Sequence, residues 1–256
     1  MTNRRKILVT GGTGNIGDLL LDGLDQYEVV IQGRTPKNEA QAEALQKADL
    51  TDYGEIEALM DGVDTVVHLA GSSSPESSWD DVLESNIIGF RNTLEAARAQ
   101  GVRRFVFASS NHINGMYDRD EEWPVYPHML PRPDSLYGVS KAFGEAMGRF
   151  YHDEYGIDFI ALRIGWTSGD PDLADVDLLR AMWLSERDTV EVIRCAIEAD
   201  VTWGLYYAVS DNPNRRWDIT NTMLELGYRP KDSYTDYSDV PENTDEPTPS
   251  DWPKNS

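Results

Sequence analysis

The chain has 256 residues, of which 40% are hydrophobic, and its 45 acidic and 23 basic residues give a net charge of −22. This length suits one large domain or a domain with a small appendage, and no run approaches the roughly 20 apolar residues of a membrane span. The negative charge excludes nucleic acid and anionic membranes as partners, because both would repel the protein.

Strand and helix signals alternate along the first two thirds of the chain. Short apolar runs predict strands at 6–10, 28–32, 47–50, 65–69, 104–108 and 158–164, and amphipathic stretches predict helices at 16–25, 53–60, 79–100 and 137–155. This alternation is typical of the α/β class. It predicts a Rossmann-like, doubly wound parallel sheet whose ligand crevice lies at the carboxyl ends of the strands.

The pattern becomes less regular after residue 165. It predicts loop and short helix over 166–182, a helix over 186–199 and a strand over 204–209. We therefore expect a dinucleotide-binding domain over 1–165 and a small substrate-binding region, interleaved with it, over 166–242. Residues 243–256 are rich in proline and acidic residues and are expected to form a mobile tail.

A glycine-rich turn follows the first predicted strand. Gly11, Gly14 and Gly17 lie between that strand and a predicted helix, which is the context of a dinucleotide-binding fingerprint. The glycines let the backbone approach a pyrophosphate closely, and the helix N-terminus supplies amide donors. Asn15 and Ile16 lie inside the same turn, and we expect them to contact the cofactor as well.

The tip of the second strand helps to decide between NAD and NADP. NAD sites place an acid there for the ribose hydroxyls, whereas NADP sites accommodate an arginine for the extra phosphate. This chain has Gln32, Gly33 and Arg34 at the tip, without an acid. The residues favour NADP or the use of both cofactors, with a merely solvated Arg34 as the alternative.

Segments that follow later strands complete the predicted cofactor site. Asp49 and Leu50 follow the third strand, where the carboxylate can meet an adenine or cap the next helix. The fourth strand ends in small residues that let a cofactor lie close, with contacts predicted at Leu69, Ala70 and Gly71. Asn86 is a poor helix former inside a predicted helix. Its amide is expected to bind backbone or water behind the site, with a plain surface position as the alternative.

Tyr137 and Lys141 are four residues apart on a predicted helix, so both lie on one face. An ammonium beside a phenol favours the phenolate, so we predict a Tyr137 pKa below its ordinary value of about 10. Such a phenol can take a proton from a hydroxyl while a hydride leaves the same carbon. Ser110, at the end of the fifth strand, is expected to bind the substrate oxygen. Asn111 and His112 would bind further hydroxyls of a polyol, or form a loop pair without a ligand.

Taken in this order, the motifs resemble those of the extended short-chain dehydrogenase/reductases over residues 5–165. Segments 107–112, 136–141, 162–165, 181–185 and 211–212 resemble the uronate dehydrogenases and the NAD-dependent glucose-6-phosphate dehydrogenases of salt-loving archaea. The resemblance implies oxidation at C1 of a hexuronate or hexose (phosphate) to the lactone. Tyr137 would be the base, Lys141 would bind the nicotinamide ribose and Ser110 would polarise the reacting oxygen. Sugar contacts are implied for Ser73, Asn111 and His112.

Two features depart from the family pattern. Leu178 occupies the position of the arginine that binds the sugar carboxylate in uronate enzymes, so we assign that role to Arg180 instead. The acid after the second strand is missing, so NAD, favoured by the resemblance, and NADP, favoured by Arg34, both stay open. Arg163 is expected to bind backbone carbonyls of the loop after the sixth strand.

Two other functions compete with a sugar dehydrogenase. A nucleotide-sugar epimerase or dehydratase of the same superfamily would need a larger second domain than the residues after the sixth strand provide. A non-catalytic dinucleotide sensor commonly loses the catalytic tyrosine or lysine, and both are present here. The expected ligands are therefore NAD or NADP and a small polyhydroxylated substrate.

The remaining expectations concern location, assembly and metal. Residues 1–6 pass directly into a strand without the apolar region of a signal peptide, so we expect a cytoplasmic protein. Cys195 is the only cysteine, which excludes an intrachain disulfide and a cysteine metal cluster, and no metal site is predicted. The long helices over 79–100 and 137–155 suggest a homodimer or larger homo-oligomer, by analogy with this fold.

The acid excess also predicts a dependence on salt. Such a composition resembles that of proteins from a salt-loaded cytoplasm, with an ordinary acidic protein as the alternative. Without salt, the self-repulsion of a net charge of −22 is unscreened. We expect the protein to lose structure or activity when salt is removed, as measured by circular dichroism and turnover across a salt series. Full stability in dilute buffer would contradict this prediction.

Overall fold

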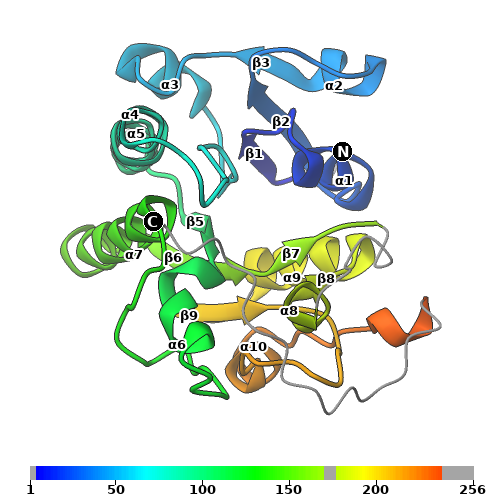
Figure 1. Ribbon diagram of the computed structural model, residues 1–256. Helices are drawn as coiled ribbons and strands as arrows, with labels where there is room; N and C mark the ends of the chain where they lie inside the picture. Colours follow the sequence, from blue (N-terminus) through cyan, green and yellow to red (C-terminus); the bar gives the residue numbers. More distant parts are fainter. Residues whose placement is uncertain (1–3, 170–176, 238–256) are drawn as a thin grey trace.

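The computed structural model describes residues 4–169 and 177–237, in which a parallel sheet lies between two layers of helices (Figure 1). Its strands are β1 (Lys6–Thr10), β2 (Glu28–Gly33), β3 (Leu45–Lys47), β4 (Thr65–His68), β5 (Arg104–Ser110), β6 (Asp158–Ile164) and β9 (Trp203–Ala208). Their order across the sheet is β3-β2-β1-β4-β5-β6-β9, and each neighbouring pair is parallel. The chain changes direction across the sheet between β1 and β4, where doubly wound folds bind their ligands. The predicted α/β fold is confirmed.

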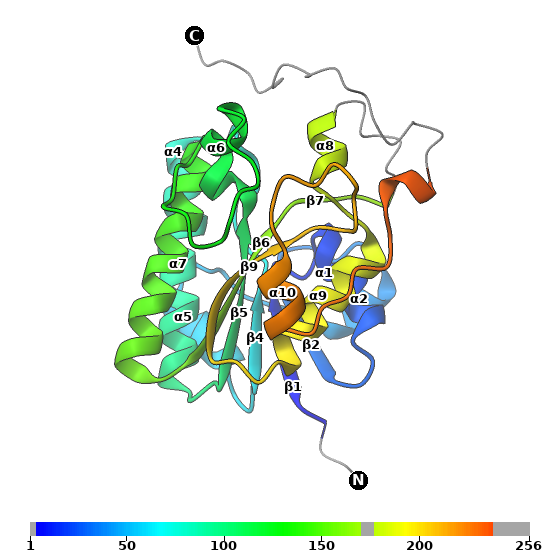
Figure 2. The same ribbon diagram turned by 90° about the horizontal axis from the view of Figure 1, so that it is seen from below.

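Helices cover both faces of this sheet. Figure 2 shows α5 (Phe90–Ala99) and α7 (Leu136–Tyr155) on one side, with α1 (Asn15–Gly23), α2 (Glu39–Ala44) and α9 (Glu186–Glu198) on the other. Helix α3 (Tyr53–Leu59) packs against α5, and α10 (Thr220–Glu225) packs against β9. Successive strand residues point to opposite faces, so Ile7 and Val9 join one hydrophobic core and Leu8 joins the other.

Shorter elements surround the carboxyl ends of the strands. They are α4 (Trp79–Asp81), η1 (Val82–Gly89), η2 (Asn111–Asn114), α6 (Gly115–Arg119), α8 (Asp177–Ala181), η4 (Tyr234–Asp236) and the strand pair β7 (Trp166–Thr167) and β8 (Trp183–Leu184). The chain after residue 165 also contributes to the main sheet, because β9 pairs with β6 and α9 packs against α1. The boundary at residue 165 stays a prediction, and the expected tail at 243–256 lies outside the described residues.

Three local predictions are corrected by the structure. The third strand is Leu45–Lys47 rather than 47–50, because these three residues pair with β2 before the chain turns away. The helix predicted over 79–100 consists of α4, the π-helical segment η1 and α5 in succession. Helix α2 was not expected. It begins where the Asn38 side chain accepts a hydrogen bond from the backbone amide of Gln41.

Large apolar side chains are exposed on the helices that the sequence assigns to an oligomer contact. Trp79 on α4 is 55% exposed, and Val139 and Phe150 on α7 are 50% and 54% exposed. These side chains agree with the expected homo-oligomer, which stays a prediction. Within residues 4–169 and 177–237, no helix has the length and apolar character to cross a membrane.

Candidate active site

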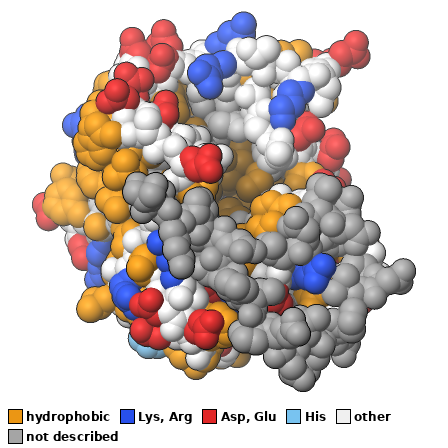
Figure 3. Space-filling view, viewed as in Figure 1, with side chains coloured by type: hydrophobic (Ala, Val, Ile, Leu, Met, Phe, Trp, Pro, Cys, Tyr) orange, Lys and Arg blue, Asp and Glu red, His pale blue; other side chains and the backbone are white. Residues whose placement is uncertain are grey.

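A cleft lies at the carboxyl ends of the strands, and its volume is about 1400 Å³. This exceeds the roughly 300–1,000 Å³ of most small-ligand pockets and leaves room for a dinucleotide beside a second ligand. Figure 3 shows the hollow in the middle of this face of the molecule. The cleft brings together the predicted residues Gly11, Gly14, Asn15, Ile16, Gly17, Arg34, Asp49, Leu50, Leu69, Ala70, Gly71, Ser73, Ser110, Asn111, His112, Tyr137 and Lys141. Two further predicted residues, Asn86 and Arg180, are not part of this lining.

The glycine-rich turn requires glycine because side chains there would collide with backbone. A Cβ atom on Gly11 would lie 2.7 Å from the backbone of Ala70, and one on Gly17 would lie 2.3 Å from the carbonyl oxygen of Gly12. Gly11 also has a φ of 69°, which other residues rarely adopt. Helix α1 begins at Asn15 directly after this turn, so its unpaired N-terminal amides are available to an anion.

The buried side chain of Gln32, at the tip of β2, connects two loops of the cleft. Its Oε1 accepts a hydrogen bond from the backbone N–H of Gly11 at 3.0 Å, and its Nε2 donates to the carbonyl of Ala48 at 2.7 Å. The glycine turn is thereby tied to the loop after β3. The sequence analysis considered Gln32 only because no acidic residue stands at this position. An amide at a strand tip can, however, both donate and accept hydrogen bonds, and so reach both neighbouring loops.

Charged groups line the cleft near the tip of β2. The exposed side chains of Arg34 and Lys47 lie there together with Asp49. Hydrogen bonds from the backbone and hydroxyl of Thr51 hold the pKa of the Asp49 carboxyl below its ordinary value, with a further contribution from Arg34. Asp49 is therefore ionised at neutral pH, and two cations stand beside it.

Asn86 lies behind the cleft and not in its wall. It belongs to η1, and π-helical turns often mark functional sites. Its Oδ1 accepts from the backbone N–H of Ser72 at 2.7 Å, and its Nδ2 donates to the Ser72 carbonyl at 3.0 Å and to Ser140 Oγ at 2.8 Å. The amide binds backbone as expected and joins the loop after β4 to α7. Its proposed effect on a cofactor is therefore indirect.

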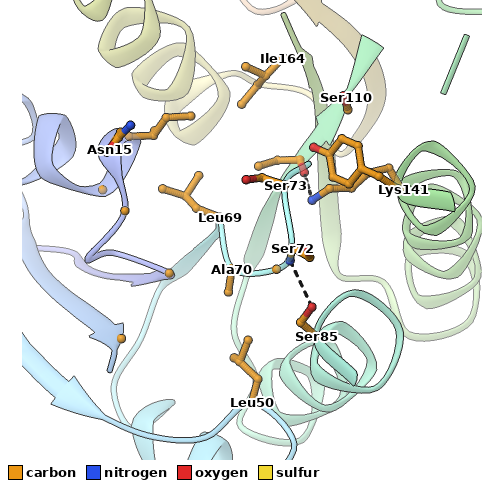
Figure 4. A pocket seen from close by; sticks show the side chains of 18 of the residues that line it. Asn15, Leu50, Leu69, Ala70, Ser72, Ser73, Ser85, Ser110, Lys141 and Ile164 are labelled. Atoms are coloured by element: carbon orange, nitrogen blue, oxygen red, sulfur yellow. Dashed lines mark hydrogen bonds between the residues drawn. The ribbon is translucent and has the colours of Figure 1, made fainter. Parts of the chain in front are cut away.

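Tyr137 and Lys141 lie on the buried face of α7, whose N-terminus is capped by Ser135. Lys141 Nζ donates a hydrogen bond to the carbonyl of Ala108 at 2.7 Å and lies 5.5 Å from the centre of the Tyr137 ring. Figure 4 shows Lys141 and Ser110 at the same end of the cleft. A phenol, an ammonium and a hydroxyl thus meet at the ends of β5 and α7.

The electrostatics of this pair differ from the sequence expectation. Burial raises the pKa of Tyr137, a hydrogen bond from Ser110 lowers it, and the carboxylate of Asp134 raises it. Burial also lowers the pKa of Lys141 to about 8. The predicted lowering of the Tyr137 pKa is wrong for this structure, because desolvation of the phenolate outweighs the hydrogen bond from Ser110.

A buried polar network holds α7 against the sheet. Glu145 Oε1 accepts from Ser109 Oγ at 2.7 Å, and its two oxygens pair with Nε and Nη2 of Arg163, each at 2.8 Å. Arg163 also donates to the carbonyl of Pro127 at 3.2 Å. The expectation that Arg163 binds the loop after β6 is corrected, since its main partner is a carboxylate on α7.

Asp134 fixes the orientation of His112. The Nδ1 atom of His112 lies 2.9 and 3.0 Å from the two carboxylate oxygens of Asp134, whose side chain is 1% exposed. The imidazole also meets the Tyr137 ring edge-on, with the ring centres 5.7 Å apart. A carboxylate at Nδ1 sets both the tautomer and the direction of the ring. Sequence reasoning missed Asp134, although its place just before the helix that bears Tyr137 was a usable signal.

Arg180 lies on α8, but its neighbours Leu179 and Met182 line the cleft instead. Leu178 is 8% exposed and packs in the hydrophobic core. The role of Arg180 in binding a sugar anion stays a prediction.

Comparison with known proteins places this cleft in a family. Residues 7–177 match the model of the NAD dependent epimerase/dehydratase family. The chain belongs to this family. The expected resemblance to the extended short-chain dehydrogenase/reductases is thereby confirmed.

Three relatives resemble the chain over nearly all of its length. It is 37% identical to the NAD-dependent glucose-6-phosphate dehydrogenase of Haloferax volcanii, with 94% of this chain and 98% of that protein aligned. It is also 37% identical to the L-arabinose 1-dehydrogenase (NAD(P)(+)) of the same organism, over 89% and 97% of the two chains. The crystal structure of glucuronic acid dehydrogenase from Chromohalobacter salexigens matches with a TM-score of 0.82 and 34% identity, covering 90% and 86%.

The contact between His112 and Asp134 generates a prediction. Asp134→Asn removes the negative charge that holds His112 in place. We therefore expect the KM of the substrate to rise by about tenfold, which is the effect of losing one hydrogen bond to a charged group. The limb of the pH profile on which oxidation rises with pH should move to lower pH, because Asp134 raises the pKa of Tyr137. Steady-state kinetics across a pH series measure both effects.

The control is Asp153→Asn on the outer face of α7, where Asp153 is 52% exposed and pairs with Arg149. It should change neither quantity. An unchanged pH profile in Asp134→Asn would show that the carboxylate does not act on Tyr137.

Proposed function

We propose that this protein is an NAD(P)-dependent dehydrogenase that oxidises C1 of a cyclic sugar to the lactone. The observation that supports this most directly is the buried Tyr137 beside Ser110 and Lys141 in a cleft with a glycine-rich dinucleotide turn. The three relatives described above are named as dehydrogenases of sugars or sugar acids, which supports the same reaction class.

Tyr137 is the proposed base. It takes the proton of the C1 hydroxyl as the C1–H bond breaks and the C1–O bond becomes a carbonyl. A bound nicotinamide cofactor would accept the hydride from C1. Ser110, whose hydroxyl hydrogen-bonds to Tyr137, also holds the reacting oxygen. Lys141 carries a positive charge beside the Tyr137 ring at pH values below its own pKa of about 8.

Neutral polar groups are proposed to bind the remaining hydroxyls of the sugar. Ser73, Asn111 and His112 line the cleft near the phenol. Asn111 is held by a contact of its Nδ2 with Met182 Sδ at 3.1 Å, and His112 is held by Asp134. These fixed directions would orient C1 toward Tyr137, which is how a site gains rate from binding.

An epimerase or a non-catalytic sensor is less well supported. The described chain after β6 returns to the main sheet as α9, β9 and α10, and forms no large second domain there. Tyr137, Lys141 and Ser110 are all present in the cleft, which argues against a protein that only senses a dinucleotide.

We further propose that the site accepts NADP through Arg34. Arg34 and Lys47 line the cleft near the tip of β2, and Lys37 donates a hydrogen bond to Asn15 in the same region at 3.0 Å. In a chain with a net charge of −22, these cations would provide local attraction for an additional phosphate. The name of the arabinose dehydrogenase includes both cofactors, which agrees with dual use.

The base assignment predicts the behaviour of Tyr137→Phe. We expect turnover to fall by roughly 10²–10⁴-fold, the usual contribution of a general base, while the Kd of NAD(P) stays the same. In the unsubstituted protein, oxidation should accelerate as pH rises, because burial holds the Tyr137 pKa above its ordinary value and the phenolate forms only in alkali. Tyr155→Phe, on an exposed part of the same helix, is the control. Retained turnover in Tyr137→Phe would refute the assignment.

The cofactor assignment predicts the behaviour of Arg34→Asp. We expect the Kd of NADP to rise by about 10–100-fold, the range of one charge-assisted hydrogen bond, with a much smaller change for NAD. Fluorescence titration with each cofactor measures this ratio. Arg4→Asp changes the net charge equally at an exposed site near the opposite end of β1 and should leave the ratio unaltered. Equal loss of both cofactors in Arg34→Asp would contradict the role of Arg34.

A further inference from the structure

We propose that the sugar site selects an uncharged aldose over the uronate or sugar phosphate of the same configuration. This inference rests on the proposed dehydrogenase function and concerns the half of the cleft around Tyr137. That sugar half is lined by Ser73, Ser110, Asn111, His112, Tyr137, Trp166, Thr167, Leu179 and Met182. Its side chains are hydroxyl, amide, imidazole, aromatic and aliphatic groups.

The cations that line the cleft are not available to a substrate anion. Within the described chain, the basic residues of the lining are Arg34, Lys47 and Lys141. The first two lie near the tip of β2. Lys141 is committed to the carbonyl of Ala108 at 2.7 Å beside the Tyr137 ring.

His112 also offers no positive charge to bind a substrate anion. His112 faces the carboxylate of Asp134 at 2.9 Å, and that carboxylate is almost fully buried. A proton gained by the imidazole would therefore be balanced by the negative charge of its partner. The pair as a whole offers an anion no net positive charge.

Two acidic residues also line the cleft. Asp81 of α4 and Glu84 of η1 line the cleft. They are close in sequence to Ser85, whose Oγ accepts from the backbone N–H of Ser72, the residue before Ser73. A carboxylate or phosphate on the sugar would share the cleft with these acids in a protein of net charge −22, which is unfavourable.

Apolar side chains from α8 and from the residue that follows it line this half of the cleft. Leu179 lies on α8 and Met182 comes directly after its last residue, Ala181. Leu178 points into the hydrophobic core, and Arg180 does not contribute to the described lining. In the described part of this region, the side chains in contact with the cleft are therefore aliphatic, those of Leu179 and Met182.

The test compares sugars that differ in one substituent. L-arabinose, D-galactose and D-galacturonate share their configuration from C2 to C4, as do D-xylose, D-glucose, D-glucuronate and D-glucose 6-phosphate. We expect kcat/KM for the neutral members to exceed that of their anionic partners by at least about tenfold, the effect of one unpaired charge. Equal or higher kcat/KM for an anionic sugar would overturn the inference. Failure of every sugar to reduce either cofactor would instead overturn the proposed function.

The second arm of the test introduces a positive charge into the lining of the cleft. Leu179→Arg should raise kcat/KM for galacturonate relative to galactose by about tenfold or more, as one charge-assisted pair would, whereas Leu179→Gln should not. Thr167→Lys and Thr167→Gln repeat this comparison at a second lining position if the first pair fails to fold. Arg180→Ala tests the competing assignment. A selective loss of turnover with anionic sugars in that variant would show that Arg180 holds the anion and that the inference is wrong.

Discussion

The attachment of α7 to β5 is the constraint on which the site depends. Lys141 reaches the carbonyl of Ala108, and Glu145, four residues later on the same helix face, reaches Ser109. Tyr137 begins this series and meets Ser110 at the end of the strand. Gly144 permits the close approach, because a Cβ atom there would lie 2.5 Å from the ring of Phe107. The phenol therefore has a fixed place above the strand ends.

This attachment has an electrostatic consequence. The same close packing that fixes Tyr137 and Lys141 also removes water from them, which raises one pKa and lowers the other. Glu145 and Arg163 satisfy each other behind the pair, so the buried carboxylate does not act on Lys141 as an unpaired charge. The Tyr137 phenol is therefore held in a fixed place but is weakly ionised at neutral pH.

Much of the fold followed from local patterns. Alternating apolar runs and amphipathic stretches were sufficient for the order of strands and helices. The glycines at 11, 14 and 17 and the pair Tyr137 and Lys141 were predicted at one site, and the structure brings them to one cleft. The third strand was misplaced because its bounds depend on pairing with β2, which no local pattern contains.

The side chains that the sequence did not reveal act across long separations. The carboxylate partner of His112 is 22 residues away, and the partner of Glu145 is 18 residues away. Gln32 and Ala48 meet only because β2 and β3 are neighbours. The pKa of Tyr137 was predicted in the wrong direction because spacing reports a nearby ammonium but not the loss of water.

The most direct test of the central claim follows the hydrogen on C1 of the sugar. A sugar deuterated at C1 should transfer its label to the reduced cofactor, with slower turnover than the unlabelled sugar and with lactone as the product. Label that remains on the sugar, without net reduction of NAD or NADP, would contradict a dehydrogenase in which Tyr137 removes the C1 hydroxyl proton.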